Sequence, residues 1–332
     1  MTIERRAFLK TAAALSAAGS LSSLPFAAAR AQALDVARIL AGFAPGGTND
    51  VLSRHIAQQI QGGYAPSVVV ENRTGAAGQL AISATKQAAP DGRTMLVVPM
   101  AGLAIYPFIY GSLPYDPFKD LTPVSLAGVF DTGLAVGPMV PREVKNVPDF
   151  LAWAKANPAR ASCGSPAAGT PQHFMIELLS RAGGVPLVHV PYRGSQPAVM
   201  DTVGAQVAAV AAPVGEFRQQ AELGKLRVLA TATTRRGKFT PDVPTFAEQG
   251  FKGLEFAEWF AVFLPPKASP ELVGRLNAEL RKALAVPSLI EGVANVGIEA
   301  RWSSAEDLAA RLRGDTAQWG PVVKSIGFKV DS

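Results

Sequence analysis

Gly42-Phe43-Ala44-Pro45-Gly46-Gly47-Thr48-Asn49-Asp50, or GFAPGGTND, lies between an apolar run and a run with helical periodicity. These runs predict a buried strand over residues 36–43 and a helix over residues 50–61. Gly46 and Gly47 allow positive φ and a close approach of the backbone to a ligand, and Thr48, Asn49 or Asp50 can cap the helix. Because the first N–H groups of a helix are unpaired, the stretch predicts a neutral seat for an anion.

Two further junctions between a strand and a helix have the same composition. In CGSPAAGTPQHF, a loop over residues 164–169 precedes Thr170 as the expected N-cap and Pro171 at the first helical position. In VPYRGSQPA, Arg193, Gly194 and Ser195 precede another helical run. Each loop by itself is only a turn. Three of them, all beyond the carboxyl ends of predicted strands, favour one ligand site in a cleft.

Strands and helices alternate in two series, which predicts parallel β-α-β units with helices on both sheet faces. Two extended stretches, LTPVSLAGVFDTGLAVGP and LRVLATATT, join the series and indicate two crossings of the chain. We therefore expect a hinged α/β protein with two lobes. Lobe 1 is predicted over 34–133 and 233–332, and lobe 2 over 134–232. The predicted helices after the first cover residues 78–88, 171–181, 195–203, 269–285 and 287–296, with a last one from residue 305.

The first 33 residues have the pattern of an export signal. Arg5 and Arg6 begin a twin-arginine motif, a mostly apolar stretch follows, and Ala31-Gln32-Ala33 is a cleavage signal of small residues. We expect a twin-arginine (Tat) signal peptide over 1–33 and a mature protein in the bacterial periplasm. The segment carries four Lys or Arg and one Glu, so its removal lowers the formal net charge from +6 to +3.

The remaining composition argues against several classes of protein. A single cysteine, Cys163, excludes an internal disulfide and a cysteine metal cluster, and the three histidines lack the spacing of metal ligands. We expect no metal and no organic cofactor. Basic residues form no block, so binding of nucleic acid is not supported. The chain has no GxSxG elbow and no phosphate-binding GxxxxGK[ST] loop. An exported hydrolase or a thiol enzyme using Cys163 remains the alternative class.

Several segments resemble the Bug family, the periplasmic solute receptors of tripartite tricarboxylate transporters. The resemblance covers essentially the whole mature chain in order, and the combination of ENRTGAAG with PDGRT is specific. The segments are RRAFLK, FAPGGTNDVLSRHIA, VVVENRTGAAGQLAISATKQAAPDGRTML, CGSPAAGTPQHFMIELLSRAGGVPLVHVPYRGSQPAVMDTVGAQV, GKLRVLATATTRR, PDVPTFAEQGF and EWFAVFLP.

The resemblance implies a two-lobed periplasmic-binding-protein fold, a type II-like Venus flytrap with two crossing strands. It implies a monomeric receptor, not an enzyme, that captures a small carboxylate and delivers it to the membrane subunits of a transporter. The carboxylate would be a di- or tricarboxylate or an aromatic carboxylate. Presentation of the ligand to a sensor kinase is the alternative. The implied ligand-binding residues are Phe43, Gly46, Gly47, Thr48, Asn49, Asn72, Ser165, Thr170, Gln172, His173 and Arg193.

The chain departs from the family's pattern in ways that reduce the polarity expected of the pocket. Ala167-Ala168-Gly169 lacks a polar side chain that relatives often have, and Pro99-Met100-Ala101 replaces small hydroxyl residues. Ala208 stands at an often acidic position, and the following AVAAPVGEF offers Pro213 and Phe217. We therefore expect a more apolar pocket than that of an amino-acid or citrate receptor, suited to an aromatic or partly apolar carboxylate.

Overall fold

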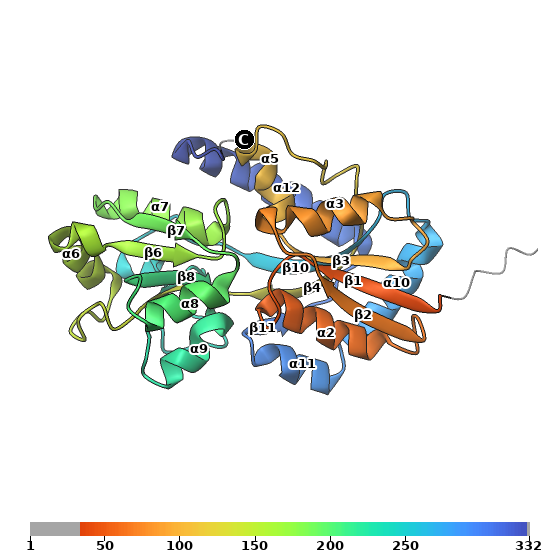
Figure 1. Cartoon of the computed structure of the whole chain (residues 1–332), viewed down its shortest axis with the longest axis horizontal. Helices are drawn as coiled ribbons and strands as arrows, with labels where there is room; N and C mark the ends of the chain where they lie inside the picture. Colours follow the sequence, from red (N-terminus) through yellow and green to blue (C-terminus); the bar gives the residue numbers. More distant parts are fainter. Residues whose placement is uncertain (1–33, 331–332) are drawn as a thin grey trace, which may run out of the picture. The chain divides into compact units, whose positions relative to one another are not determined.

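The computed structural model describes residues 34–330, which belong to one compact unit with two β-sheets (Figure 1). The signal peptide predicted over 1–33 lies outside the described residues. The two sheets with their helices confirm the two-lobed α/β fold that the sequence predicts.

The larger sheet has the strand order β11-β4-β10-β3-β1-β2. Strand β1 pairs in parallel with β2 and β3, as the alternation of strands and helices predicts. Strands β4, β10 and β11 pair antiparallel. The six strands are β1 (Val36–Ala41), β2 (Ser67–Asn72), β3 (Thr94–Pro99), β4 (Thr122–Phe130), β10 (Glu258–Leu264) and β11 (Ile298–Ala300).

The smaller sheet has the order β7-β6-β8-β5-β9. Strand β6 pairs in parallel with β7 and β8, and β5 pairs antiparallel with β8 and β9. Both sheets thus place the carboxyl ends of their parallel strands beside the starts of the following helices. The five strands are β5 (Thr132–Val136), β6 (Ser162–Ser165), β7 (Val188–Pro191), β8 (Ala209–Pro213) and β9 (Arg227–Thr231).

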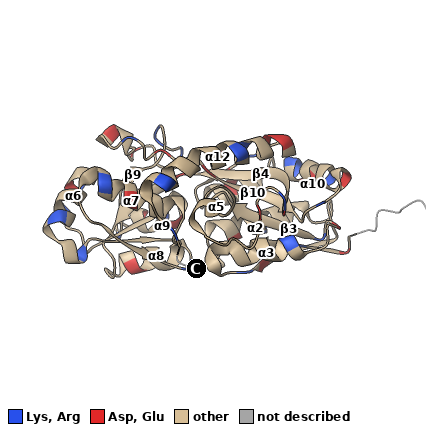
Figure 2. Ribbon diagram, turned by 90° about the horizontal axis from the view of Figure 1, so that it is seen from above, with Lys and Arg blue, Asp and Glu red and all other residues tan. Residues whose placement is uncertain are grey.

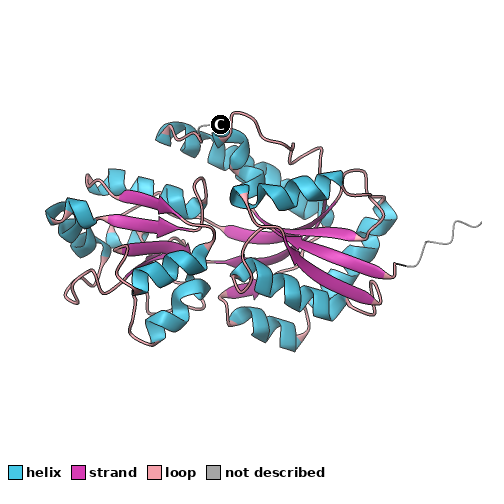
Figure 3. Ribbon diagram, viewed as in Figure 1, coloured by secondary structure: helices cyan, strands magenta, loops and turns pink. Residues whose placement is uncertain are grey.

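Helices cover both faces of each sheet (Figure 3). In the described residues, those around the larger sheet are α2 (Thr48–Ile60), α3 (Gln79–Gln87), α4 (Ala101–Ala104), α5 (Tyr106–Ile109), α10 (Pro270–Ala283), α11 (Pro287–Ala294) and α12 (Ala305–Ile326). Those around the smaller sheet are α6 (Val147–Ala156), α7 (Pro171–Gly183), α8 (Ser195–Val203) and α9 (Val214–Glu222). Short 3₁₀ turns cover Ala76–Gly78, Pro158–Arg160 and Ala247–Gln249.

The chain passes between the sheets through two segments. Strand β4 belongs to the larger sheet and β5 to the smaller one, with only Asp131 between them. The return lies between β9 and β10, where Ala232 N donates to Thr132 O at 2.8 Å and Phe256 N donates to Ala232 O at 2.8 Å. The two passages therefore lie side by side and hydrogen bond to each other.

Buried apolar side chains continue from one sheet to the other. A single cluster includes Trp259 of the larger sheet and both Phe150 and Phe174 of the helices around the smaller sheet. The long helix α12 contributes Trp319, whose ring centre lies 5.9 Å from that of Phe174. At the end of α12, Ile326 O accepts a hydrogen bond from Arg181 Nη2 of α7 at 2.6 Å. The last helix therefore ties the two sheets together.

Local sequence signals predicted several helix starts correctly and one cap wrongly. Helix α8 has the predicted bounds, and α7 begins with Thr170 as N-cap and Pro171 as its first residue. The N-cap of α2 is Gly47, however, and no side chain caps that end. Thr48, Asn49 and Asp50 are already inside the helix, so none of them can be its cap. Helices α4, α5, α6 and α9 were not predicted.

Acidic and basic residues are interspersed along the helices of both sheets (Figure 2). Among residues 34–330, no helix is both long and apolar enough to cross a membrane.

The cap of α7 yields a test of local stability. Thr170 Oγ1 accepts from His173 N at 3.3 Å and donates to Ala167 O at 2.9 Å. We expect Thr170→Ala to lower the free energy of unfolding by about 1 kcal/mol, because loss of an N-cap typically costs that much. Thr170→Ser keeps the hydroxyl and should lose far less. Urea denaturation measures both, and an Ala variant as stable as the Ser variant would contradict the role of this cap.

Candidate ligand-binding site

One pocket lies between residues of the two sheets, and the helices that begin at its wall include α2, α7 and α8. Helix α2 approaches it from the larger sheet, and α7 and α8 approach it from the smaller one. All three junctions singled out in the sequence therefore meet at one place. The wall residues from these helix starts are Gly47, Thr48, Asn49, Thr170, Pro171, Gln172, Gly194, Ser195 and Gln196.

Much of the remaining wall is apolar, in line with the expectation from the sequence. The rings of Phe130 and Phe260 stack with their centres 4.6 Å apart, and Phe43 contributes a third aromatic side chain. Such a surface favours a ligand with an apolar part. The prolines of the wall are Pro99, Pro166, Pro171, Pro197 and Pro213.

Gly46 and Gly47, before α2, differ in backbone conformation, which we did not predict. Gly46 has φ +83°, so it occupies the left-handed region that favours glycine. Gly47 has φ −76° and ψ 167°, an extended conformation open to other residues. A Cβ at Gly47 would stand 3.4 Å from Glu216 Oε1, which is ordinary contact distance. The prediction that Gly47 adopts positive φ was therefore wrong; Gly47 matters because it lines the pocket.

A polar cluster behind the glycine pair holds this loop in place. Asp50 Oδ2 accepts from Gly46 N and from Arg54 Nε, both at 2.9 Å. Asn72 Nδ2 donates to Asp50 Oδ1 at 2.8 Å and to Phe43 O at 3.1 Å. Burial acts to raise the pKa of Asp50, but these hydrogen bonds outweigh it and hold the pKa below its usual value. Asp50 and Asn72 are thus used inside the loop.

Glu216 reaches from α9 to the first turn of α2. Its Oε1 accepts from Thr48 N at 2.7 Å, and its Oε2 accepts from Gln196 Nε2 at 2.6 Å. The carboxylate therefore occupies one unpaired N–H at the positive end of α2. Burial nevertheless raises the pKa of Glu216. Glu216 was not predicted as a pocket residue from the sequence. In AVAAPVGEF we expected Pro213 and Phe217 to contribute to the pocket, but Phe217 lies in the apolar core.

Glu258, on β10, is the second acidic residue of the pocket wall and is also buried. Its Oε1 accepts hydrogen bonds from Gln172 Nε2 at 2.8 Å and from Thr132 Oγ1. Gln172 Nε2 also donates to Thr132 Oγ1 at 2.7 Å. Burial raises the pKa of Glu258 to about 7. The three side chains come from β10, α7 and β5, so they connect the larger sheet to the smaller one.

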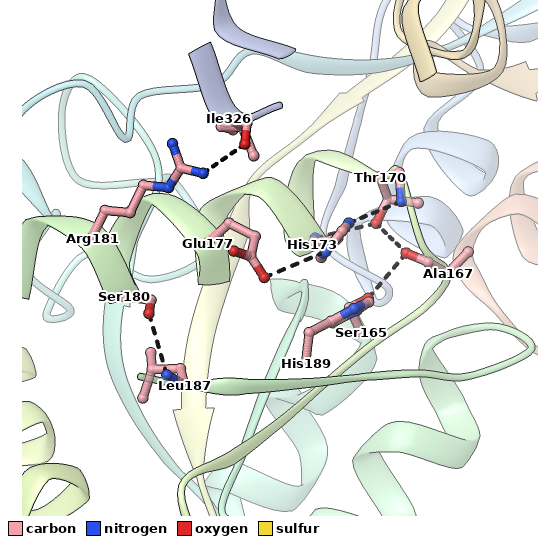
Figure 4. A network of polar contacts seen from close by, with 11 residues as sticks. Ser165, Ala167, Thr170, His173, Glu177, Ser180, Arg181, Leu187, His189 and Ile326 are labelled. Carbon is pink, nitrogen blue, oxygen red and sulfur yellow. Dashed lines mark hydrogen bonds and ion pairs between the residues drawn. The ribbon is translucent and has the colours of Figure 1, made fainter. Parts of the chain in front are cut away.

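Ser165 and His173 lie in a network behind the pocket wall (Figure 4). Ser165 Oγ donates to Ala167 O at 3.1 Å, and a hydrogen bond of 2.7 Å joins Ser165 Oγ to His189 Nε2. His173 Nδ1 accepts from Gly169 N at 3.1 Å. Burial lowers the pKa of His173 to about 4 and that of His189 to about 3, so both rings are neutral at physiological pH.

The structure brings part of the predicted residue set together. The pocket wall includes Phe43, Gly47, Thr48, Asn49, Thr170 and Gln172. It does not include Gly46, Asn72, Ser165, His173 or Arg193, and Arg193 lines a neighbouring cavity with Tyr192. The main wall residues that sequence reasoning missed are Phe130, Gln196, Glu216, Glu258 and Phe260.

Cys163 does not line the pocket. It is completely buried on β6, and burial raises its pKa to about 12, so its side chain stays a thiol at neutral pH. A nucleophilic cysteine requires the thiolate. Within residues 34–330, no three His, Cys, Asp or Glu side chains are grouped so that they could hold a metal ion.

A pocket between two α/β sheets that are joined by two passages is the architecture typical of periplasmic solute-binding proteins. Residues 52–328 match the model of the tripartite tricarboxylate transporter family receptor, TctC. The protein BugT of Bordetella pertussis is 31% identical over 88% of this chain and 90% of its own. The chain belongs to this TctC or Bug family of periplasmic receptors, and the alternative of an exported enzyme is set aside.

Solved structures of relatives have the same fold. An R. palustris protein with adipate is 30% identical, with a TM-score of 0.84 over 89% of this chain and 98% of its own. MatC from Rhodopseudomonas palustris with bound malate is 25% identical, with a TM-score of 0.79 over 87% of this chain and 99% of its own.

The raised pKa of Glu258 predicts a pH-dependent contribution to stability. The pKa of Glu258 is 4.5 at its ordinary value and about 7 in the folded protein. Between these two pH values, the folded protein keeps a proton on Glu258 that the unfolded chain has released. The contribution of Glu258 to the free energy of unfolding is therefore complete below pH 4.5 and decreases as the pH rises to about 7.

Glu258→Gln removes this titration while keeping an oxygen that can accept the same hydrogen bonds. We expect the wild type to lose stability relative to Glu258→Gln as the pH rises through this window. Melting curves of both proteins at several pH values measure the difference, in which other titrating groups cancel. A difference that stayed constant with pH would contradict the assigned pKa shift.

Proposed function

We propose that this receptor captures a small carboxylate in the pocket between its sheets and delivers it to the membrane subunits of a tripartite tricarboxylate transporter. The observation that carries the proposal is the meeting of three helix starts, from both sheets, at one partly apolar pocket. Backbone N–H groups at helix starts, with the helix dipole behind them, bind anions without a cationic side chain.

Free donors for a carboxylate remain at all three helix starts, and the one at α7 is Gln172 N. Asn49 N and Asp50 N lie in the first turn of α2, and Ser195 N and Gln196 N lie in the first turn of α8. Residues in a first turn have no acceptor within their own helix, and none of these four N–H groups has another acceptor among the described residues. Thr48 N is the exception, because Glu216 occupies it. A carboxylate that bridged the other donors would contact both lobes.

Closure of the lobes on the ligand follows from this division of contacts. A ligand that contacts both lobes binds the closed form better, and only such a difference in affinity can shift the balance between open and closed forms. The hinge would lie in the two passages, near residues 130–136 and 229–234. We take the lobes as 34–133 with 233–332 and 134–232, and the protein as a monomer exported by the twin-arginine route.

The relatives support a carboxylate as the ligand. The solved structures of two R. palustris family members contain adipate and malate, which are both dicarboxylates. The aromatic and proline side chains of the present pocket favour a carboxylate with an apolar or aromatic body.

The test combines a ligand screen with a pocket variant. Mono- and dicarboxylates, aliphatic and aromatic, are screened by thermal shift, because a ligand at about 100 times its dissociation constant stabilises the native state by about 2.7 kcal/mol. In Gly47→Val, the extended backbone and the Cβ position are compatible with a side chain, and we expect the added methyl groups to occupy space at the pocket wall beside Glu216. We expect at least about tenfold weaker binding, about 1.4 kcal/mol, by calorimetry.

Gly111→Val is the matched control, since Gly111 is exposed, has ordinary φ and has no atom near its Cβ position. It should bind like the wild type. Full-strength binding by a folded Gly47→Val protein, or a screen in which no carboxylate stabilises the wild type, would contradict the proposed function.

A further inference from the structure

The pocket wall contains two buried acidic residues and no basic one among the described residues. Glu216 is 8% exposed and Glu258 is 3% exposed, while no Lys, Arg or His side chain lines this pocket. A buried carboxylate without a cation is costly unless hydrogen bonds or a ligand compensate its charge. A ligand that carried only carboxylates would add negative charge to this wall.

The two acidic residues differ in how many of their carboxylate oxygens accept a hydrogen bond. Oε1 of Glu216 accepts a hydrogen bond from Thr48 N, and Oε2 accepts one from Gln196 Nε2. Both donors to Glu258 reach the same oxygen, Oε1. Oε2 of Glu258 has no donor among the described residues, so this oxygen is available to a ligand.

Asn49 presents a second acceptor without a partner. Its Nδ2 donates to Val97 O at 3.0 Å, which fixes the orientation of the amide. Its Oδ1 is buried and has no donor among the described residues, although Asn49 is only 3% exposed and lines the same pocket. Buried polar atoms in proteins are nearly always paired. Asn49 Oδ1 therefore still lacks a hydrogen-bond donor.

We propose that the ligand carries a cationic nitrogen in addition to its carboxylate, and that Glu258 Oε2 binds this nitrogen with Asn49 Oδ1 as a further acceptor. This inference rests on the proposed function, because the carboxylate end is assigned to the free N–H groups of α2 and α8. An ammonium group supplies three donors and the positive charge that the wall lacks. Its pairing with a carboxylate is strengthened because Glu258 is buried.

The aromatic side chains of the wall suit the same ligand. Phe43, Phe130 and Phe260 offer apolar surface for its body, and aromatic ring faces attract a nearby cation. The substrate class is thus an amino-substituted carboxylate with an apolar or aromatic middle. This class goes further than the aromatic or partly apolar carboxylate expected from the sequence, in which neither acidic residue was singled out.

Two matched series of probes test the proposal by calorimetry at mildly alkaline pH, where Glu258 is ionised. The aromatic series is benzoate, terephthalate and para-aminomethylbenzoate, and the aliphatic series is hexanoate, adipate and ε-aminocaproate. In at least one series, we expect the amino compound to bind at least about tenfold more tightly than both the monocarboxylate and the dicarboxylate, which corresponds to about 1.4 kcal/mol.

Glu258→Gln then assigns the preference to one side chain. It removes the charge and keeps the acceptor used by Thr132 and Gln172, so the ratio of the affinities for the amino compound and the monocarboxylate should fall to about one. Glu291→Gln, at an exposed position on α11, is the matched control and should keep the ratio of the wild type.

The outcomes separate this inference from the proposed function. Dicarboxylates that bind as tightly as the amino compounds, or an unchanged ratio in Glu258→Gln, would overturn the inference and leave carboxylate capture standing. Failure of all six probes to bind the wild type would count against both. The comparison among probes in the wild type decides the matter even if Glu258→Gln does not fold.

Discussion

The unpaired N–H groups at the starts of α2, α7 and α8 are the constraint on which the rest of this protein depends. A helix cannot satisfy its own first donors, and parallel strands deliver helix starts to one edge of each sheet. Here the edges of both sheets face the same pocket. The loops before these helices are accordingly rich in small residues, and Asp50, Asn72 and Ser165 hold the loops from behind.

The acidic residues of the pocket link ligand binding to the relative position of the sheets. Glu216 connects α9 of the smaller sheet to the first turn of α2, and Glu258 connects β10 to Gln172 and Thr132. Thr132 directly follows Asp131, where the chain passes between the sheets. A ligand group that bound Glu258, as we propose, would act on side chains beside the proposed hinge. In our account, recognition of the ligand and movement of the lobes involve the same few contacts.

The sequence predicts those features whose signals are local. Thr170 followed by Pro171 marked a helix start, and alternating strands and helices indicated two α/β lobes. Glu216 and Glu258 gave no such signal, because each is a single acidic residue in an otherwise ordinary helix or strand. Glu216 acquires its role from Thr48, 168 residues away, and Glu258 from Thr132, 126 residues away. Likewise, only the folded loop reveals that Asp50 accepts from Gly46 N and that Gly46, but not Gly47, has positive φ.

The central claim is that a carboxylate binds to helix starts from both lobes at once. Amide hydrogen exchange with and without the tightest probe at saturation tests it most directly, because exchange reports on individual N–H groups. The account predicts slower exchange at Asn49 and Asp50 of α2 and, at the same ligand concentration, at Ser195 and Gln196 of α8. Protection confined to one of these helix starts, or absent from both while the ligand is bound, would contradict it.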